Sequence, residues 1–119
     1  FVNSPDNALV FVKFGAIWCP PCRLVDDAIS RIAAAGGLPH TTFAEVDVDA
    51  SQELSERFQI RSLPTVRVYY KGRFLPVEGR GVRSVNGALV GGLGRRQLER
   101  ISKAALVAGE AGADRVIVP

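Results

Sequence analysis

One short apolar run, residues 9–14, constrains the fold of this chain more than any other segment. It reads Leu-Val-Phe-Val-Lys-Phe, so it is almost continuously apolar and rich in β-branched and aromatic side chains. Such runs are typical of strands that are buried on both faces of a sheet. The run breaks at Gly15, and the sequence therefore predicts a central strand with other elements packed against both of its sides.

Strands and helices alternate along the rest of the chain. In three segments apolar residues recur at helical spacing. Two other segments are short runs rich in β-branched and aromatic residues, as in strands. The pair Lys71-Gly72 predicts a two-residue turn into an antiparallel partner, whereas parallel neighbours need longer crossovers. The sequence thus predicts an α/β sandwich with a mixed sheet and helices on both faces. The predicted strands cover residues 42–48, 65–70 and a stretch from Arg73, and the predicted helices cover 22–35, 51–58 and 95–107.

Length and composition fit one small domain. The chain has 119 residues, of which 47% are hydrophobic and 23% charged. It opens with Phe1 rather than methionine, so we expect a processed or trimmed product. Its apolar stretches are far shorter than the ~20 residues of a membrane-spanning helix, so we expect no membrane span.

Two segments fit the alternating pattern less well. Residues 78–87 are rich in glycine and arginine, which predicts a mobile basic loop. Residues 109–119 follow the last predicted helix and end in Arg-Val-Ile-Val-Pro, which suits either a tail or a strand at a sheet edge. We therefore expect a domain over residues 1–108 and a separate C-terminal segment.

Charge is distributed unevenly along the chain. The net charge is +3, but residues 1–60 hold four basic and eight acidic side chains, whereas residues 61–103 hold ten basic and two acidic ones. A basic half could attract nucleic acid, acidic proteins or an anionic membrane surface. The arginines are nevertheless scattered over strands, a loop and a helix, with no aromatic RNA-binding motif. We therefore expect a solvated arginine-rich face and no nucleic-acid partner.

The two cysteines carry the chemistry that the sequence predicts. They lie in Trp18-Cys19-Pro20-Pro21-Cys22, where the first strand gives way to the first long helix. The unpaired N–H groups and the dipole at a helix start stabilise an anion, so the thiol of Cys19 should ionise readily and act as the nucleophile. Cys22, one turn further and more buried, would close a disulfide with Cys19 and release the bound partner.

Three other interpretations of the cysteines compete with this one. A structural disulfide that closes so short a loop would add only about 2 kcal/mol of stability. A zinc site needs further ligands, but His40 is the single histidine and no third cysteine exists, so we expect no metal. Two inert buried thiols remain an alternative, which the specific pentapeptide at a strand-to-helix junction disfavours.

These residues resemble the thioredoxin family. Phe14-Gly-Ala-Ile-Trp-Cys-Pro-Pro-Cys22 is followed by Ile60-Arg-Ser-Leu-Pro-Thr65, and the similarity covers residues 8–107. The resemblance implies a thioredoxin-like fold whose first strand is largely missing here. It also implies about eleven extra residues in a basic loop at about 76–88.

The resemblance also implies a substrate groove. The proline that matches Pro64 is cis in the family and lies against the redox pair, and Leu63-Pro64 and Gly91-Gly92 would line the groove that pairs with the substrate backbone. Trp18 would cover the disulfide. The alternatives are a trans proline that starts an edge strand and a tryptophan that packs in the core.

Three residue choices depart from the family pattern. The Pro-Pro pair between the cysteines is similar to the centre of tryparedoxins and nucleoredoxins. Lys13, six residues before Cys19, stands where thioredoxins have a buried aspartate, and Glu45 stands where they have its lysine partner. We expect Lys13 and Glu45 to form an ion pair beneath the cysteines, because an unpaired buried charge is unfavourable. Glu45 or water would then be the base for Cys22, unless Lys13 instead extends to solvent.

The sequence thus predicts a thiol–disulfide oxidoreductase that reduces protein disulfides, with a reductase or small dithiol as electron donor and no cofactor. The alternatives are an oxidase or isomerase of an oxidising compartment, and a binding scaffold that does not need its cysteines. We expect a monomer in a reducing compartment. The mitochondrial matrix is favoured over the cytosol because the isoelectric point is near 9.2 and the N-terminal residues of the family are missing.

Overall fold

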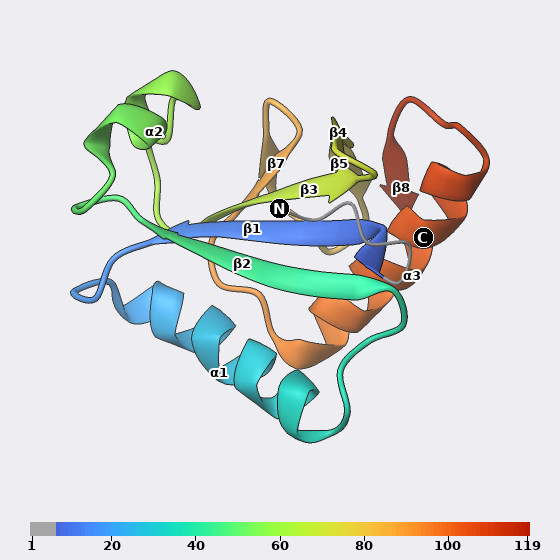
Figure 1. Cartoon of the computed structure of the whole chain (residues 1–119), viewed down its shortest axis with the longest axis horizontal. Helices are drawn as coiled ribbons and strands as arrows, with labels where there is room; N and C mark the ends of the chain where they lie inside the picture. Colours follow the sequence, from blue (N-terminus) through green and yellow to red (C-terminus); the bar gives the residue numbers. More distant parts are fainter. Residues whose placement is uncertain (1–6) are drawn as a thin grey trace.

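The computed structural model describes residues 7–119 and shows strands alternating with helices along the chain (Figure 1). Every helix and long strand predicted from the sequence is present, with ends that differ by at most a few residues. The elements are β1 (Leu9–Gly15), α1 (Pro20–Ala34), β2 (Thr41–Asp47), α2 (Gln52–Arg57), β3 (Thr65–Tyr70), β4 (Arg73–Phe74), β5 (Val77–Gly79), β6 (Ser84–Val85), β7 (Ala88–Val90), α3 (Arg95–Glu110) and β8 (Val116–Val118).

The main sheet is mixed, as predicted. Its strand order is β2-β1-β3-β7-β6, and β4 pairs with β3 beside this path. Strands β1 and β2 are parallel, whereas β3 runs antiparallel to both β1 and β7. Every residue of β1 is buried, which confirms the central strand that the apolar run predicts.

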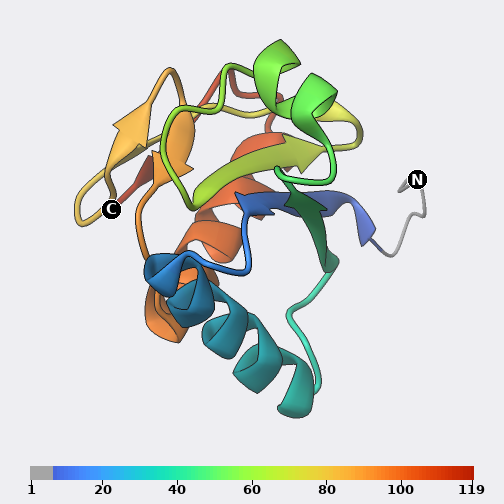
Figure 2. The same cartoon turned by 90° about the vertical axis from the view of Figure 1, so that its left-hand side faces the viewer.

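Helices cover both faces of this sheet. Figure 2 shows α2 on one side of the sheet and α1 on the other. Because side chains alternate along a strand, Leu9 and Phe11 of β1 join the core under α1 and α3. Val10, Val12 and Phe14 point the opposite way and join a second cluster with Phe58. The α/β sandwich is thereby confirmed.

Helix α1 begins where its sequence is best suited to a helix start. Cys19 is the N-cap, and Pro20 and Pro21 occupy the first two helical positions, where a missing N–H is not needed. The buried positions Cys22, Val25, Ala28 and Ile32 recur at three or four residues and face the sheet. The junction thus places both cysteines at the end of β1 and on the inner side of α1.

The segment predicted to be a mobile loop contains two short strands. Residues 78–87 include part of β5 and all of β6. Strand β6 pairs antiparallel with β7 and so adds an edge strand to the main sheet. Residues 109–119 were expected to form either a tail or a strand at a sheet edge, and the structure shows a strand within them. Strand β8 pairs in parallel with β5 in a small second sheet.

Two other expectations concern the ends and the membrane. The expected loss of the family's first strand concerns the segment before Asn7, and residues 1–6 lie outside the described residues. Among residues 7–119, no helix combines the length and the hydropathy that crossing a bilayer requires.

Candidate active site

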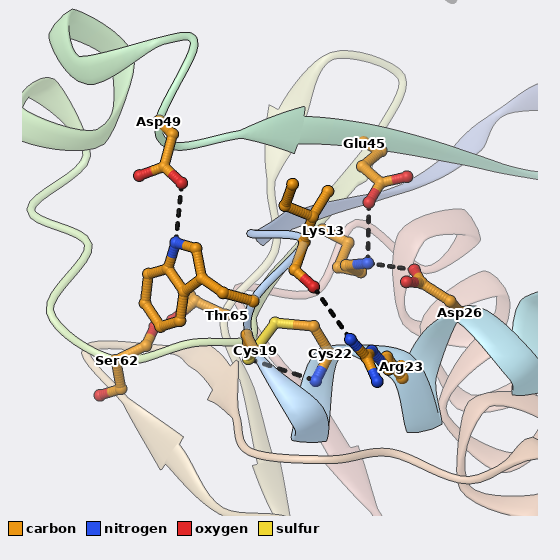
Figure 3. The surroundings of a disulfide bond; sticks show 11 residues. Lys13, Cys19, Cys22, Arg23, Asp26, Glu45, Asp49, Ser62 and Thr65 are labelled. Carbon is orange, nitrogen blue, oxygen red and sulfur yellow. Dashed lines mark hydrogen bonds and ion pairs between the residues drawn. A yellow bond between two sulfur atoms is a disulfide. The ribbon is translucent and has the colours of Figure 1, made fainter.

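Cys19 and Cys22 form a disulfide at the start of α1 (Figure 3). Their Cα atoms are 5.3 Å apart, and both side chains are buried. The backbone N–H of Cys22 donates a hydrogen bond to Sγ of Cys19 at 3.3 Å, so the sulfur caps the helix. When the disulfide opens, the same N–H group faces the sulfur that must carry a negative charge.

A groove of about 520 Å³ passes beside Cys19. Trp18 forms part of its rim and is 62% exposed, so this tryptophan does not pack in the core. Its indole N–H donates to Oδ2 of Asp49 at 2.7 Å, which fixes the ring at the mouth of the groove. The sequence analysis did not identify Asp49, because a single aspartate after a strand has no distinctive pattern.

The segment around Pro64 lies against the disulfide. The Leu63-Pro64 peptide bond is cis, and Leu63 packs on the two cysteines. The N–H of Gly91 donates to the carbonyl of Pro64 at 3.0 Å. A Cβ atom at Gly92 would lie 2.8 Å from Cδ2 of Leu24 in α1, so the chain after β7 passes close to the helix. Of the four predicted groove residues, Leu63 lines the groove beside Cys19, whereas Pro64, Gly91 and Gly92 lie outside its lining.

Lys13 lies beneath the disulfide and is only 2% exposed. Its partner in the register between β1 and β2 is Glu45, and its Nζ lies 2.8 Å from Oε1 of Glu45. The expected ion pair is therefore present, and Lys13 does not extend to solvent. Nζ also donates to Oδ1 of Asp26, which the sequence analysis did not identify (Figure 3). A signal existed, because Asp26 follows Cys22 by four residues and shares its side of α1.

Gly15 makes room for this arrangement. A Cβ atom there would lie 2.7 Å from Cε of Lys13 and 3.3 Å from both Nζ of Lys13 and Sγ of Cys22. The ammonium and the sulfur are therefore no farther apart than twice 3.3 Å. A lysine side chain can reach under the redox pair only because residue 15 has no side chain of its own.

The protonation of Lys13 follows from its neighbours. Burial lowers the pKa of Lys13, but hydrogen bonds to Asp26 and Glu45, together with the charges of these carboxylates, raise it by more. The pKa of Lys13 therefore lies above its ordinary value. Lys13 keeps its proton at neutral pH, so it supplies a positive charge and no base.

No group of three or more potential metal ligands occurs among residues 7–119. A buried disulfide at a helix start, a cis proline after Leu63 and a groove beside Cys19 define a dithiol–disulfide protein of the α/β class.

Comparison with known proteins identifies the family. The family model described as Thioredoxin matches residues 1–89, which is most of the chain. The chain belongs to the thioredoxin family, and its Cys19–Cys22 pair makes it a thiol–disulfide oxidoreductase. This confirms both the resemblance and the general class of chemistry that the sequence predicts.

Individual relatives agree with this assignment. A thioredoxin of Chlamydia trachomatis is 34% identical over 73 residues, which cover 61% of this chain and 70% of that protein. A thioredoxin of Coprinus comatus is 35% identical over 68 residues, covering 57% of this chain and 64% of the relative. The chain thus spans about two thirds of the length of these relatives.

Solved structures show the same fold. A thioredoxin of Plasmodium falciparum has 30% sequence identity and a TM-score of 0.57, over 82% of this chain and 81% of that one. The thioredoxin-2 described as a component of malaria parasite protein secretion machinery has a TM-score of 0.66 at 20% identity, covering 82% of each chain. The second similarity concerns the fold alone.

Proposed function

We propose that this protein reduces disulfides of other proteins through Cys19 and Cys22. The observation that carries the proposal is the position of the pair, at the N-terminus of α1 and beside an open groove. The helix start stabilises the thiolate of Cys19, and the groove gives an extended substrate segment a place to lie. The thioredoxin relatives support the same chemistry.

The reaction balances as two exchanges of sulfur partners. The Cys19 thiolate attacks one sulfur of the substrate disulfide, forms a mixed disulfide and releases the other sulfur as a thiolate, which takes a proton from water. Cys22 then loses its proton and attacks Sγ of Cys19. This second step forms the Cys19–Cys22 disulfide and releases the second substrate thiol, so two electrons have moved to the substrate.

The groove would hold the substrate by its backbone. Leu63 and Pro64 lie on one side of the disulfide, and Gly91 and Gly92 lie near the start of α1. Main-chain pairing of an extended segment gives affinity with little dependence on side chains. Such a groove suits many different disulfide-containing proteins.

The oxidised pair must be reduced again after each turnover. A reductase or a small dithiol would supply the two electrons. Both cysteines of the chain belong to the redox pair, which suits a reducing compartment. We propose such a compartment, with the mitochondrial matrix as the first to examine by fractionation.

Insulin reduction with a small dithiol as donor tests the proposed function. We expect wild-type protein to turn over, Cys19→Ser to be inactive, and Cys22→Ser to stop at a stable mixed disulfide. Absence of turnover by wild-type protein would contradict the proposal and leave the binding scaffold, whose cellular role would survive Cys19→Ser.

The reduction potential separates the reductase from the oxidase or isomerase. A value near that of thioredoxin, about −270 mV, supports a reductase. A value at or above that of protein disulfide isomerase, about −180 mV, supports the oxidising alternatives.

A further inference from the structure

We infer that the buried Lys13 ammonium stabilises the thiolate of Cys22, so that the second cysteine ionises by electrostatic attraction and needs no side-chain base. This inference rests on the proposed function, because it concerns the second of the two exchange steps. Lys13 touches neither substrate nor sulfur directly, so it acts as a positioned charge. The argument depends on distance, burial and orientation.

Distance and burial make the charge effective. A Cβ atom at Gly15 would lie 3.3 Å from Nζ of Lys13 and 3.3 Å from Sγ of Cys22, so these two atoms border the same empty position. Both side chains are almost completely buried, so little water lies between them to screen the interaction. An opposite charge at about 4–6 Å favours the ionised form of a group.

Orientation decides the sign of the local field. Figure 3 shows the carboxylates of Asp26 and Glu45 on the far side of the ammonium from the disulfide. Their side chains are 48% and 62% exposed, so solvent screens them more than it screens Lys13. Cys22 therefore faces the positive end of the cluster, and the two carboxylates hold the lysine charged and in place.

The ammonium of Lys13 borders a cavity on its side away from the disulfide. A cavity of about 220 Å³, lined by Lys13, Asp26 and Glu45 among others, opens to the surface between α1 and β2. In the second exchange step the proton passes to water, and the thiolate left behind attacks Sγ of Cys19. A stabilised Cys22 thiolate also stabilises the reduced protein, which makes the reduction potential less negative.

A side-chain base would show in the rate of the second exchange step. If Asp26 or Glu45 accepted the proton of Cys22, removal of its charge would slow this step. Removal of either negative charge lowers the pKa of Cys22 in both mechanisms, because a nearby like charge disfavours the thiolate. Removal of the Lys13 charge should raise the pKa of Cys22 if the ammonium stabilises the thiolate, so Lys13 carries the test.

The test uses Cys19→Ser, in which Cys22 is the sole thiol. Thiolate absorbance measured against pH then reports Cys22 alone. We expect Lys13→Met to raise the midpoint of the Cys22 titration by about one pH unit or more. We expect Asp26→Asn, which can still accept a hydrogen bond from Lys13, to lower it. Lys103→Met, at an exposed position of α3, is the matched control and should leave it unchanged.

Each outcome supports or overturns the inference. An unchanged or lower midpoint in Lys13→Met would overturn it, as would a slower second exchange step in Asp26→Asn, which would indicate a side-chain base. Should Lys13→Met fail to fold, Lys13→Gln, which removes the charge and can still donate hydrogen bonds to the two carboxylates, decides by the same midpoint. The titration involves no substrate, so its failure differs from a failure of insulin reduction. In the protein with both cysteines, Lys13→Met should have a more negative reduction potential.

Discussion

Because of Lys13, the free energy of unfolding should depend on pH in the alkaline range. Its pKa in the folded protein is raised by Asp26 and Glu45 above the value of an unfolded chain, about 10.4. Such a group contributes stability that is fully present below the unfolded pKa and is lost as pH rises through the folded one. Between the two pKa values the loss is at most about 1.4 kcal/mol for each pH unit.

We therefore predict how wild type and Lys13→Met differ in their free energies of unfolding. The difference in free energy of unfolding should be constant from about pH 7 to 9. Above about pH 10 the wild type should lose stability relative to Lys13→Met. Urea unfolding of both proteins at a series of pH values measures this. A constant difference up to about pH 11.5, or a change already near neutral pH, would contradict the prediction.

Single residues at the site were predictable when a pattern placed them. Cys19, Cys22 and Pro64 lie in distinctive motifs, and Glu45 was found because the family resemblance set the register of two parallel strands. Asp26 was missed because an aspartate on a helix is ordinarily a solvated residue. Its spacing of four residues from Cys22 placed it on the side of α1 that carries Cys22, and the hydrogen bond from Lys13 shows that it reaches the buried charge.

At the scale of elements, β8 shows how a short strand at the C-terminal end can belong to the core. Val116 and Val118 are buried with the residues of α1 and α3, whereas Ile117 between them is 56% exposed. Gly79 lies so close to the backbone of Val118 that a Cβ atom there would overlap it. The parallel pairing of β5 with β8 therefore requires glycine at this position.

We predict that Val116→Ala lowers the free energy of unfolding by about 2–3 kcal/mol, because it removes two buried methyl groups and leaves a cavity. Ile117→Ala, on the same strand, is the matched control and should change it by no more than about 0.5 kcal/mol. Chemical denaturation of the three proteins provides the comparison. Equal effects of the two substitutions would show that β8 is not part of the cooperative core.

Elements with a clear pattern of apolar residues were predicted well, and elements without such a pattern were not. Strand β3 occupies the predicted residues, because its apolar run is bounded by a proline and a turn. Strands β5 and β6 lie in a segment whose glycines and arginines indicate a loop. Their pairing depends on partners far along the chain, which local periodicity does not report.

For the whole molecule, the uneven charge of the sequence reaches the active-site groove. Arg61 lines both this groove and a second cavity, whose wall includes Arg67 and the β6–β7 turn. The guanidinium of Arg67 lies 3.9 Å from the ring centroid of Phe74 and 4.9 Å from that of Phe58, so it is held by aromatic rings. Among residues 7–119, neither arginine has a carboxylate within ion-pair distance. Positive charge without a carboxylate partner therefore lies at the groove and in the adjoining cavity, and the other charged residue that lines the groove is Asp49.

Substrates with acidic residues beside their disulfide should accordingly be reduced faster than substrates with basic ones. At an ionic strength of about 0.01 M we predict roughly a three- to tenfold difference in kcat/KM between two such model peptides, shrinking towards none at about 1 M salt. Arg61→Ala should reduce this preference. Arg31→Ala removes the same charge at the far end of α1 and should leave most of it intact. If Arg61→Ala and Arg31→Ala lose the preference for acidic substrates equally, the preference comes from net charge. If the wild type shows no such preference, the arginines do not contribute to substrate choice.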